Sequence, residues 1–204
     1  MGVQASDLDP DTVAWLLEVD DPAVRYFTLT ALLGEPAASA EAAAARREIM
    51  TTGAVPRILA AQGDDGHWGD RDRFYTAKYT GTAWQLIILA ELGADGADKR
   101  VRGAYEAILR DSKDPESGGF SVNRSKNAGG GLHSSVIPRL TGNLVFSLIR
   151  LGYLEDPRVR LAIDWITIYQ RFVDAEGEAP PVGPMTRGRC AGGGKPATWG
   201  RSRR

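Results

Sequence analysis

The chain has 204 residues, of which 43% are hydrophobic and 25% are charged, so one domain or slightly more can form a sizeable core. The formal net charge of -1 gives no bulk attraction to nucleic acid or to anionic membranes. No apolar run is long enough to span a bilayer, the acidic N-terminus is unlike a secretion signal, and the single cysteine, Cys190, excludes an internal disulfide. We therefore expect a cytoplasmic protein without a transmembrane segment and without a nucleic-acid partner.

Helix signals begin near the N-terminus. Asp9-Pro10 and Asp21-Pro22 each combine an N-cap residue with a proline at the first helical position. Gly34 is a natural stop for the second of these helices. Further helices are expected over 39–50 and 55–62.

Two pairs of helices follow. Residues 80–92 are apolar nearly all round, which predicts a buried inner helix, whereas 98–111 are apolar on one face, which predicts an outer helix. The ranges 140–151 and 157–170 show the same succession, after a Gly-, Ser- and Asn-rich loop over 117–132. No range shows a strand pattern.

The two pairs align as an internal repeat. Each first helix begins at a Thr-Gly string and ends at Leu-Gly, and an Arg-Val-Arg string follows. The aligned strings are Thr80-Gly81-Thr82 with Thr141-Gly142-Asn143, Leu92-Gly93 with Leu151-Gly152, and Arg100-Val101-Arg102 with Arg158-Val159-Arg160. One such helical hairpin cannot bury its apolar face alone, so neighbouring hairpins are expected to stack.

A loop signature precedes the first pair. Gln62 is followed by Gly66 and Trp68; the Gln can bond to free carbonyls at a helix end, and the Trp can pack while its indole N–H keeps a partner. We expect this motif to act as a structural staple between neighbouring hairpins. Gly118-Gly119-Phe120 is a weaker copy.

With the repeats around it, the Gln62–Trp68 segment resembles the Gln-Trp motif of the squalene–hopene cyclase and protein prenyltransferase superfamily. Further strings look like an uncharacterised bacterial branch labelled prenyltransferase-like or squalene-cyclase-like: Phe74-Tyr75, Lys78-Tyr79-Thr80-Gly81-Thr82, Trp84-Gln85-Leu86, Gly118-Gly119-Phe120-Ser121 and Leu140-Thr141-Gly142-Asn143. The resemblance covers about residues 8 to 199. It implies an all-α fold of helical-hairpin repeats arranged as an α/α toroid.

Another helix pair follows the region of Cys190 and Trp199-Gly200 in that family, whereas this chain ends at Arg204. We therefore expect an incomplete ring. Residues 1–186 would form the partial toroid domain, and 187–204 a basic, Gly-rich and disordered tail.

The catalytic groups of the family find weak counterparts. Class II cyclases use an Asp-x-Asp-Asp acid, and the nearest string, Glu18-Val19-Asp20-Asp21, ends in an expected helix cap. Zinc in prenyltransferases needs Asp, Cys and His, but Gly188 stands two residues before Cys190, and the two histidines are isolated. We expect no metal and no cofactor, with His67 in a solvent-facing slot beside Trp68 and His133 in a polar loop.

A cationic and aromatic group surrounds the start of the 80–92 helix and its repeat. In the architecture that the resemblance implies, these helix ends open on a central cavity, and the group could bind an anionic or diphosphate-bearing ligand. The candidate residues are Arg71, Arg73, Tyr75, Lys78, Tyr79, Trp84, Gln85, Arg139 and Asn143. The alternative is that they pack the loop and pair with Asp70 and Asp72.

Three hypotheses of function remain. The first is a non-catalytic repeat protein that binds an isoprenoid or another anionic small molecule. The second is a HEAT-like scaffold for protein partners, favoured by Asp21-Pro22-Ala23-Val24-Arg25, and the third is an active terpenoid cyclase or prenyltransferase. An unclosed ring would also leave an apolar flank after the 157–170 helix, through which the chain could self-associate.

Overall fold

The computed structural model describes residues 9–18 and 20–169, which form an all-α structure. The α-helices are α1 (Pro10–Glu18), α2 (Pro22–Phe27), α3 (Ala40–Ile49), α4 (Ala54–Ala60), α5 (Thr82–Glu91), α6 (Lys99–Asp111), α7 (Pro138–Arg150) and α8 (Pro157–Tyr169). A π-helical turn, η2 (Thr28–Leu32), continues α2, and the short 3-10 turns are η3 (Arg71–Arg73), η4 (Lys78–Thr80) and η5 (His133–Ser135). Over these residues the all-α prediction is confirmed; the predicted tail, 187–204, lies outside them.

Three helical hairpins share one construction. The first helix of each hairpin ends at a glycine in the left-handed region, which only glycine adopts at little cost: Gly34 at φ +73°, Gly93 at +74° and Gly152 at +91°. The second helix begins at a side-chain cap: Ser39, Asp98 and Asp156 accept the backbone N–H groups of Ala42, Arg100 and Arg158. We call α2–η2 with α3 hairpin 1, α5 with α6 hairpin 2, and α7 with α8 hairpin 3.

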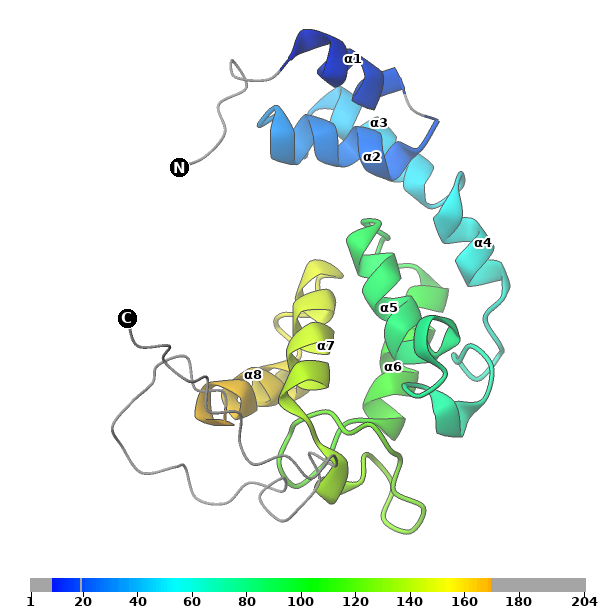
Figure 1. Ribbon diagram of the computed structural model, residues 1–204, viewed down its shortest axis with the longest axis vertical. Helices are drawn as coiled ribbons and strands as arrows, with labels where there is room; N and C mark the ends of the chain where they lie inside the picture. Colours follow the sequence, from blue (N-terminus) through cyan, green and yellow to red (C-terminus); the bar gives the residue numbers. More distant parts are fainter. Residues whose placement is uncertain (1–8, 19, 170–204) are drawn as a thin grey trace, which may run out of the picture.

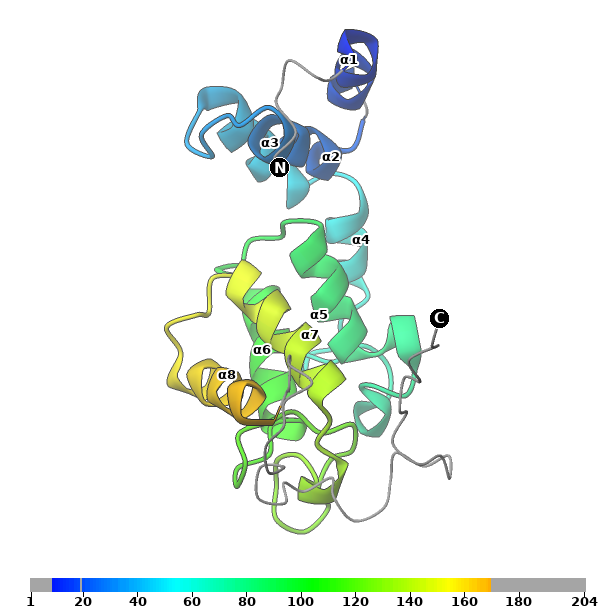
Figure 2. The same ribbon diagram turned by 60° about the vertical axis from the view of Figure 1, so that its left-hand side comes forward.

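Hairpins 2 and 3 pack directly on each other. α5 lies beside α7, with α6 packed on α5 and α8 packed on α7 (Figures 1 and 2). Fully buried side chains fill the space between these helices, and each contributes about 2 kcal/mol through its burial; they include Leu86, Leu89, Val101, Ile108, Leu144 and Leu148. Hairpins 2 and 3 therefore form one continuous core.

The second helices are joined by polar and aromatic contacts. Arg158 of α8 donates two hydrogen bonds, of 2.7 and 2.8 Å, to the Glu106 carboxylate of α6. The ring of Tyr105 stacks on that of Tyr153, with the centroids 3.9 Å apart. These contacts fix hairpin 3 against hairpin 2.

Hairpin 1 stands at the other end of a curved row and is joined to hairpin 2 through α4 (Figure 1). α1 packs on α2, on the side of α2 that faces away from α5. Arg150, at the end of α7, lies 5.2 Å from the ring centre of Phe27 in hairpin 1. None of the helices described here is both long enough and apolar enough to cross a membrane.

The structural repeat differs from the predicted alignment at its start. The Oγ1 atom of Thr82 accepts the N–H of Trp68 at 3.2 Å, and that of Thr141 accepts the N–H of Phe120 at 2.9 Å. Thr82 therefore corresponds to Thr141, and the predicted alignment of Thr82 with Asn143 is wrong. The equivalence of Gly93 and Gly152 is confirmed by their matching helix-end hydrogen bonds.

The glycines of the two Thr-Gly strings have different structural roles, so the strings do not mark equivalent positions. A Cβ at Gly81 would lie 2.4 Å from the carbonyl oxygen of Phe74, so this glycine permits a close backbone approach. A Cβ at Gly142 would have no atom within 4 Å. The two strings therefore share a sequence pattern but not a structural role.

The loop before α5 closes against α6 at Gly66, where φ is +86° and a Cβ would lie 2.5 Å from the Gly103 carbonyl oxygen. We expect Gly66→Ala to lower the free energy of unfolding by about 3 kcal/mol, because a backbone clash adds to left-handed strain. Gly34→Ala is the control, since its φ is similar and its Cβ would meet nothing within 4 Å; we expect it to cost about 1 kcal/mol. Urea unfolding measures both, and equal losses would contradict the close approach.

Candidate functional site

The predicted Gln-Trp motif ties together three parts of the chain. The side-chain amide of Gln62 donates to the carbonyl of Gly66 at 3.0 Å and to that of Arg100, in α6, at 2.9 Å. The buried indole of Trp68 donates from Nε1 to the carbonyl of Ile58, in α4, at 2.8 Å. The motif therefore links α4, the following loop and α6.

His67 lies inside this loop, and its predicted solvent-facing position is wrong: the residue is only 1% exposed. Its Nδ1 lies 2.8 Å from Thr82 Oγ1, and its Nε2 lies 2.8 Å from Asp111 Oδ2. If Nε2–H donates to Asp111, Nδ1 accepts from the Thr82 hydroxyl, which itself accepts the N–H of Trp68. The Nη2 atom of Arg110 also lies 3.2 Å from His67 Nε2.

Asp111 completes a buried charged cluster. Arg71 donates two hydrogen bonds to its carboxylate, at 2.7 and 2.5 Å, and Arg110 donates a weaker one at 3.3 Å. Burial on its own would raise the pKa of the Asp111 carboxyl, but the hydrogen bonds from Arg71 and His67 outweigh burial and lower it. The hydrogen bonds of Arg71 and His67 to Asp111 thus hold the loop to α6.

A second group of side chains gathers at the N-terminal end of α5 and is partly open to solvent. The rings of Tyr75 and Trp84 stack with centroids 5.8 Å apart, and Tyr79 meets Trp84 edge-on at 5.4 Å. The indole N–H of Trp84 donates to the Tyr75 carbonyl at 3.0 Å. Tyr79 itself is 69% exposed. We call Tyr75, Tyr79 and Trp84 the aromatic cluster.

Three more predicted residues adjoin the aromatic cluster. Arg139, at the start of α7, donates to the hydroxyl of Tyr75 at 3.2 Å. Gln85 donates to the Tyr79 carbonyl at 2.6 Å, while its buried Oε1 accepts no hydrogen bond from a described residue. Lys78 lies between Tyr75 and Tyr79 in the chain, is exposed, and has a φ of +53°.

The remaining predicted residues form no hydrogen bond or ion pair with the aromatic cluster. Arg71 is engaged by Asp111. The exposed side chains of Arg73 and Asn143 make no hydrogen bond or ion pair with a described residue. The alternative prediction paired the cationic residues with Asp70 and Asp72. In the structure Asp72 pairs with Arg124 instead.

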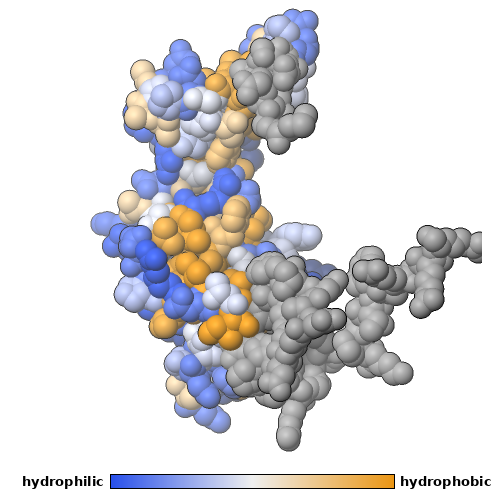
Figure 3. Space-filling model, turned by 90° about the vertical axis from the view of Figure 1, so that its left-hand side faces the viewer, coloured by the Kyte–Doolittle hydropathy of each residue, from blue (hydrophilic) through white to orange (hydrophobic). Residues whose placement is uncertain are grey.

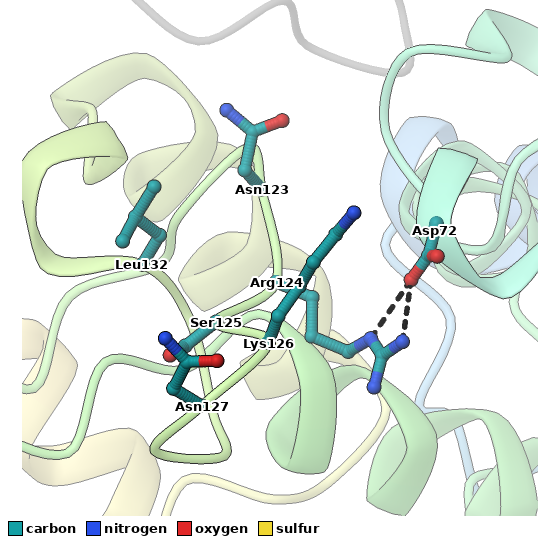
Figure 4. Close-up of a pocket in the computed structure, with 7 residues that line it drawn as sticks. All are labelled: Asp72, Asn123, Arg124, Ser125, Lys126, Asn127 and Leu132. Carbon is teal, nitrogen blue, oxygen red and sulfur yellow. Dashed lines mark hydrogen bonds and ion pairs between the residues drawn. The ribbon is translucent and has the colours of Figure 1, made fainter.

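Beside Asp72 there is a polar pocket of about 400 Å³, which sequence reasoning missed (Figure 4). Arg124 crosses from the loop before α7 and donates from Nε and Nη2 to one Asp72 oxygen, at 2.9 and 2.6 Å. The pocket is lined by Asp72, Asn123, Arg124, Ser125, Lys126, Asn127 and Leu132. The loop that lines it is long: Thr141 lies 21 positions after Phe120, whereas Thr82 lies 14 positions after Trp68.

His133 is also held by a carboxylate, because its Nδ1 lies 2.7 Å from Asp114 Oδ2 in the polar loop before α7. The hydrogen bonds of the buried Asp114 to His133 and to Ser117 keep its pKa low against the effect of burial. Among residues 9–18 and 20–169, no three His, Cys, Asp or Glu side chains are grouped so that they could hold a metal ion. Cys190 lies outside those ranges.

No protein-family model, no curated protein and no solved structure matches this chain.

Asp111 could have been found from the sequence. It follows Ile108 by three residues and Ala107 by four, which places an acidic group on the buried face of an amphipathic helix. A carboxylate there needs a cationic or hydrogen-bonding partner. Which residue supplies it depends on how the loop folds, so Arg71 and His67 could not be identified in the same way.

We expect Asp111→Asn to lower the free energy of unfolding by about 3 kcal/mol at neutral pH, since it leaves Arg71 with a weaker partner. The folded-state pKa of Asp111 is depressed, so its contribution is fully present above the unfolded-state value, near 3.9, and is lost as the pH falls below it. The difference between wild type and variant should therefore shrink below about pH 4.

Urea unfolding over a pH series measures this difference. Asp72→Asn is the control, because the Asp72–Arg124 pair is exposed and should contribute less than about 1 kcal/mol. A loss for Asp111→Asn that stays constant down to low pH would contradict the assignment.

Proposed function

We propose that this chain is a helical-repeat protein of the α/α-toroid type, which binds an anionic ligand with an apolar, isoprenoid-like chain at the aromatic cluster. The observation that carries the proposal is the partly exposed group of Tyr75, Tyr79 and Trp84 between two cationic side chains, Lys78 and Arg139. Aromatic faces suit an unsaturated hydrocarbon chain, and exposed cations suit a phosphate or carboxylate. The proposed function is binding, with no reaction assigned.

The toroid part of the proposal is supported by the order of the helices. α5 and α7 lie side by side, and each carries its own second helix, α6 or α8. A concentric double layer requires this order, in which the first helices form an inner row. The aromatic cluster and Arg139 lie at the N-terminal ends of that row, where the backbone N–H groups favour negative charge.

Charge balance supports an anionic ligand. Neither Lys78 nor Arg139 forms an ion pair with any described residue. Gln85, next to Trp84 in the chain, has a buried Oε1 atom without a donor among the described residues. A ligand with an anionic head would pair with the two exposed cations.

The cyclase hypothesis receives less support from the acidic string before α2. The Oδ1 atom of Asp21 accepts the N–H of Ala23 at 2.9 Å and caps that helix. The preceding Asp20 is exposed. Protonating an alkene needs a buried, destabilised carboxylic acid, which is a different environment.

Thermal unfolding in the presence of farnesyl diphosphate tests the proposal. A ligand at 100 times its dissociation constant should stabilise the fold by roughly 2.7 kcal/mol. Farnesol and inorganic pyrophosphate, tested separately, report on the apolar and anionic halves. We expect Arg139→Gln to weaken binding of the diphosphate roughly tenfold through loss of a charge-assisted bond.

Arg57→Gln is the matched control, because Arg57 is an exposed cation in α4, away from the cluster. It should leave binding unchanged. If none of the three compounds stabilises the protein, or if Arg57→Gln weakens binding as much as Arg139→Gln, the proposed site is wrong.

Lys78 offers a separate test. It is the non-glycine residue with positive φ in the described part of the chain, and left-handed backbone costs a lysine about 1 kcal/mol. We expect Lys78→Gly to raise the free energy of unfolding by about 1 kcal/mol and yet to weaken diphosphate binding. Calorimetry and urea unfolding of one preparation measure both; a gain in stability without a loss of binding would remove Lys78 from the site.

A further inference from the structure

The flank of hairpin 3 that faces away from hairpin 2 carries exposed apolar side chains. On α7, Phe146 is 52% exposed and Ile149 is 37% exposed. Figure 3 shows an apolar area on this side of the molecule. We define the outer flank as Ile149 of α7 together with Arg160, Ile163 and Asp164 of α8. Phe146 is not counted in it, because its ring lies next to the Arg150 guanidinium, which also contacts Phe27 of hairpin 1 and the Ala90 carbonyl of α5.

The repeat shows what normally covers this flank on the α7 side. With Gly93 matched to Gly152, Ile149 corresponds to Ala90 of α5. In hairpin 2, Ala90 is only 2% exposed because α7 packs there, and Arg150 of α7 donates to its carbonyl at 3.3 Å. The same position is covered in hairpin 2 and open in hairpin 3.

On the α8 side, too, positions that are covered in hairpin 2 are open in hairpin 3. With the caps Asp98 and Asp156 matched, Ile163 corresponds to Tyr105, and Asp164 corresponds to Glu106. Tyr105 is covered by the ring of Tyr153, and Glu106 receives the guanidinium of Arg158. In contrast, Asp164 forms no ion pair with a described residue, and Ile163 is partly exposed.

The outer flank is also self-complementary in charge. Arg160 and Asp164 stand one helical turn apart on α8, and Arg160 meets only the highly exposed Glu155. A twofold axis that runs two copies of α8 antiparallel would bring Arg160 of each copy opposite Asp164 of the other. In a head-to-tail stack the outer flank would instead meet α1, which packs on α2 at the other end of the row and does not repeat the construction of the hairpins.

We propose that the protein forms a twofold-symmetric dimer in which the outer flanks of two copies cover each other. Ile149 and Ile163 of each copy are buried, and two reciprocal Arg160–Asp164 pairs set the register. The interface lies apart from the aromatic cluster, and its formation does not depend on the proposed ligand.

Sedimentation equilibrium of the full chain, from low micromolar to submillimolar concentration, tests the dimer. Wild type should approach twice the chain mass of 22.0 kDa. Ile149→Glu should raise the dissociation constant by at least roughly tenfold, because a buried aliphatic side chain is replaced by a charge. Leu161→Glu is the control, since Leu161 is an exposed apolar residue of α8, at 54%, that lies outside the outer flank.

A charge swap provides a readout that does not depend on removing apolar surface. Arg160→Glu should weaken the dimer roughly tenfold by placing like charges opposite each other, and adding Asp164→Arg should restore it. Both are exposed positions, so circular dichroism should remain that of the wild type. A wild type that is monomeric throughout the concentration range would overturn the proposal. The outer flank would then be covered by another part of the chain or by another protein. A dimer that is insensitive to Ile149→Glu and to the charge swap would also overturn it.

Discussion

The arrangement of hairpins 2 and 3 depends on one hydrogen bond that occurs in both. In each, a threonine hydroxyl near the start of the first helix accepts a backbone N–H from the preceding loop. Thr82 holds Trp68, and Thr141 holds Phe120. Each loop is then pressed against the second helix of its own hairpin, where Gly66 meets Gly103 and Gly118 meets Leu161. A helix start, a loop and an antiparallel helix are therefore fixed by one short-range contact, repeated in two hairpins.

The two copies of this contact have diverged in what surrounds them. In the first, His67 and Asp111 extend it into a fully buried polar chain that reaches Arg71. In the second, the position of His67 is taken by Gly119, beside the indole of Trp165. At this position the first loop has a buried charged and hydrogen-bonded group, whereas the second has apolar packing against Val136 and Trp165.

Local signals predicted the helices well and the contacts between distant segments poorly. Proline and cap residues placed the starts of α1 and α2, and glycine placed the ends of the first helices, because these rules act within a few residues. The burial of His67 could not be foreseen, since it depends on Asp111, 44 residues away. Of the candidate ligand residues, Arg71 was recruited by the same carboxylate, while Tyr75, Tyr79, Trp84, Gln85 and Arg139 do come together.

The segment between Phe120 and Thr141 is longer than its counterpart in hairpin 2, although both segments leave and rejoin the helices through equivalent contacts. The additional residues form one wall of the polar pocket beside Asp72 and take no part in the shared framework. Length and composition can therefore vary at this point while the neighbouring scaffold stays as it is. Substitutions or insertions in this segment can therefore change what the pocket recognises without changing the helical scaffold.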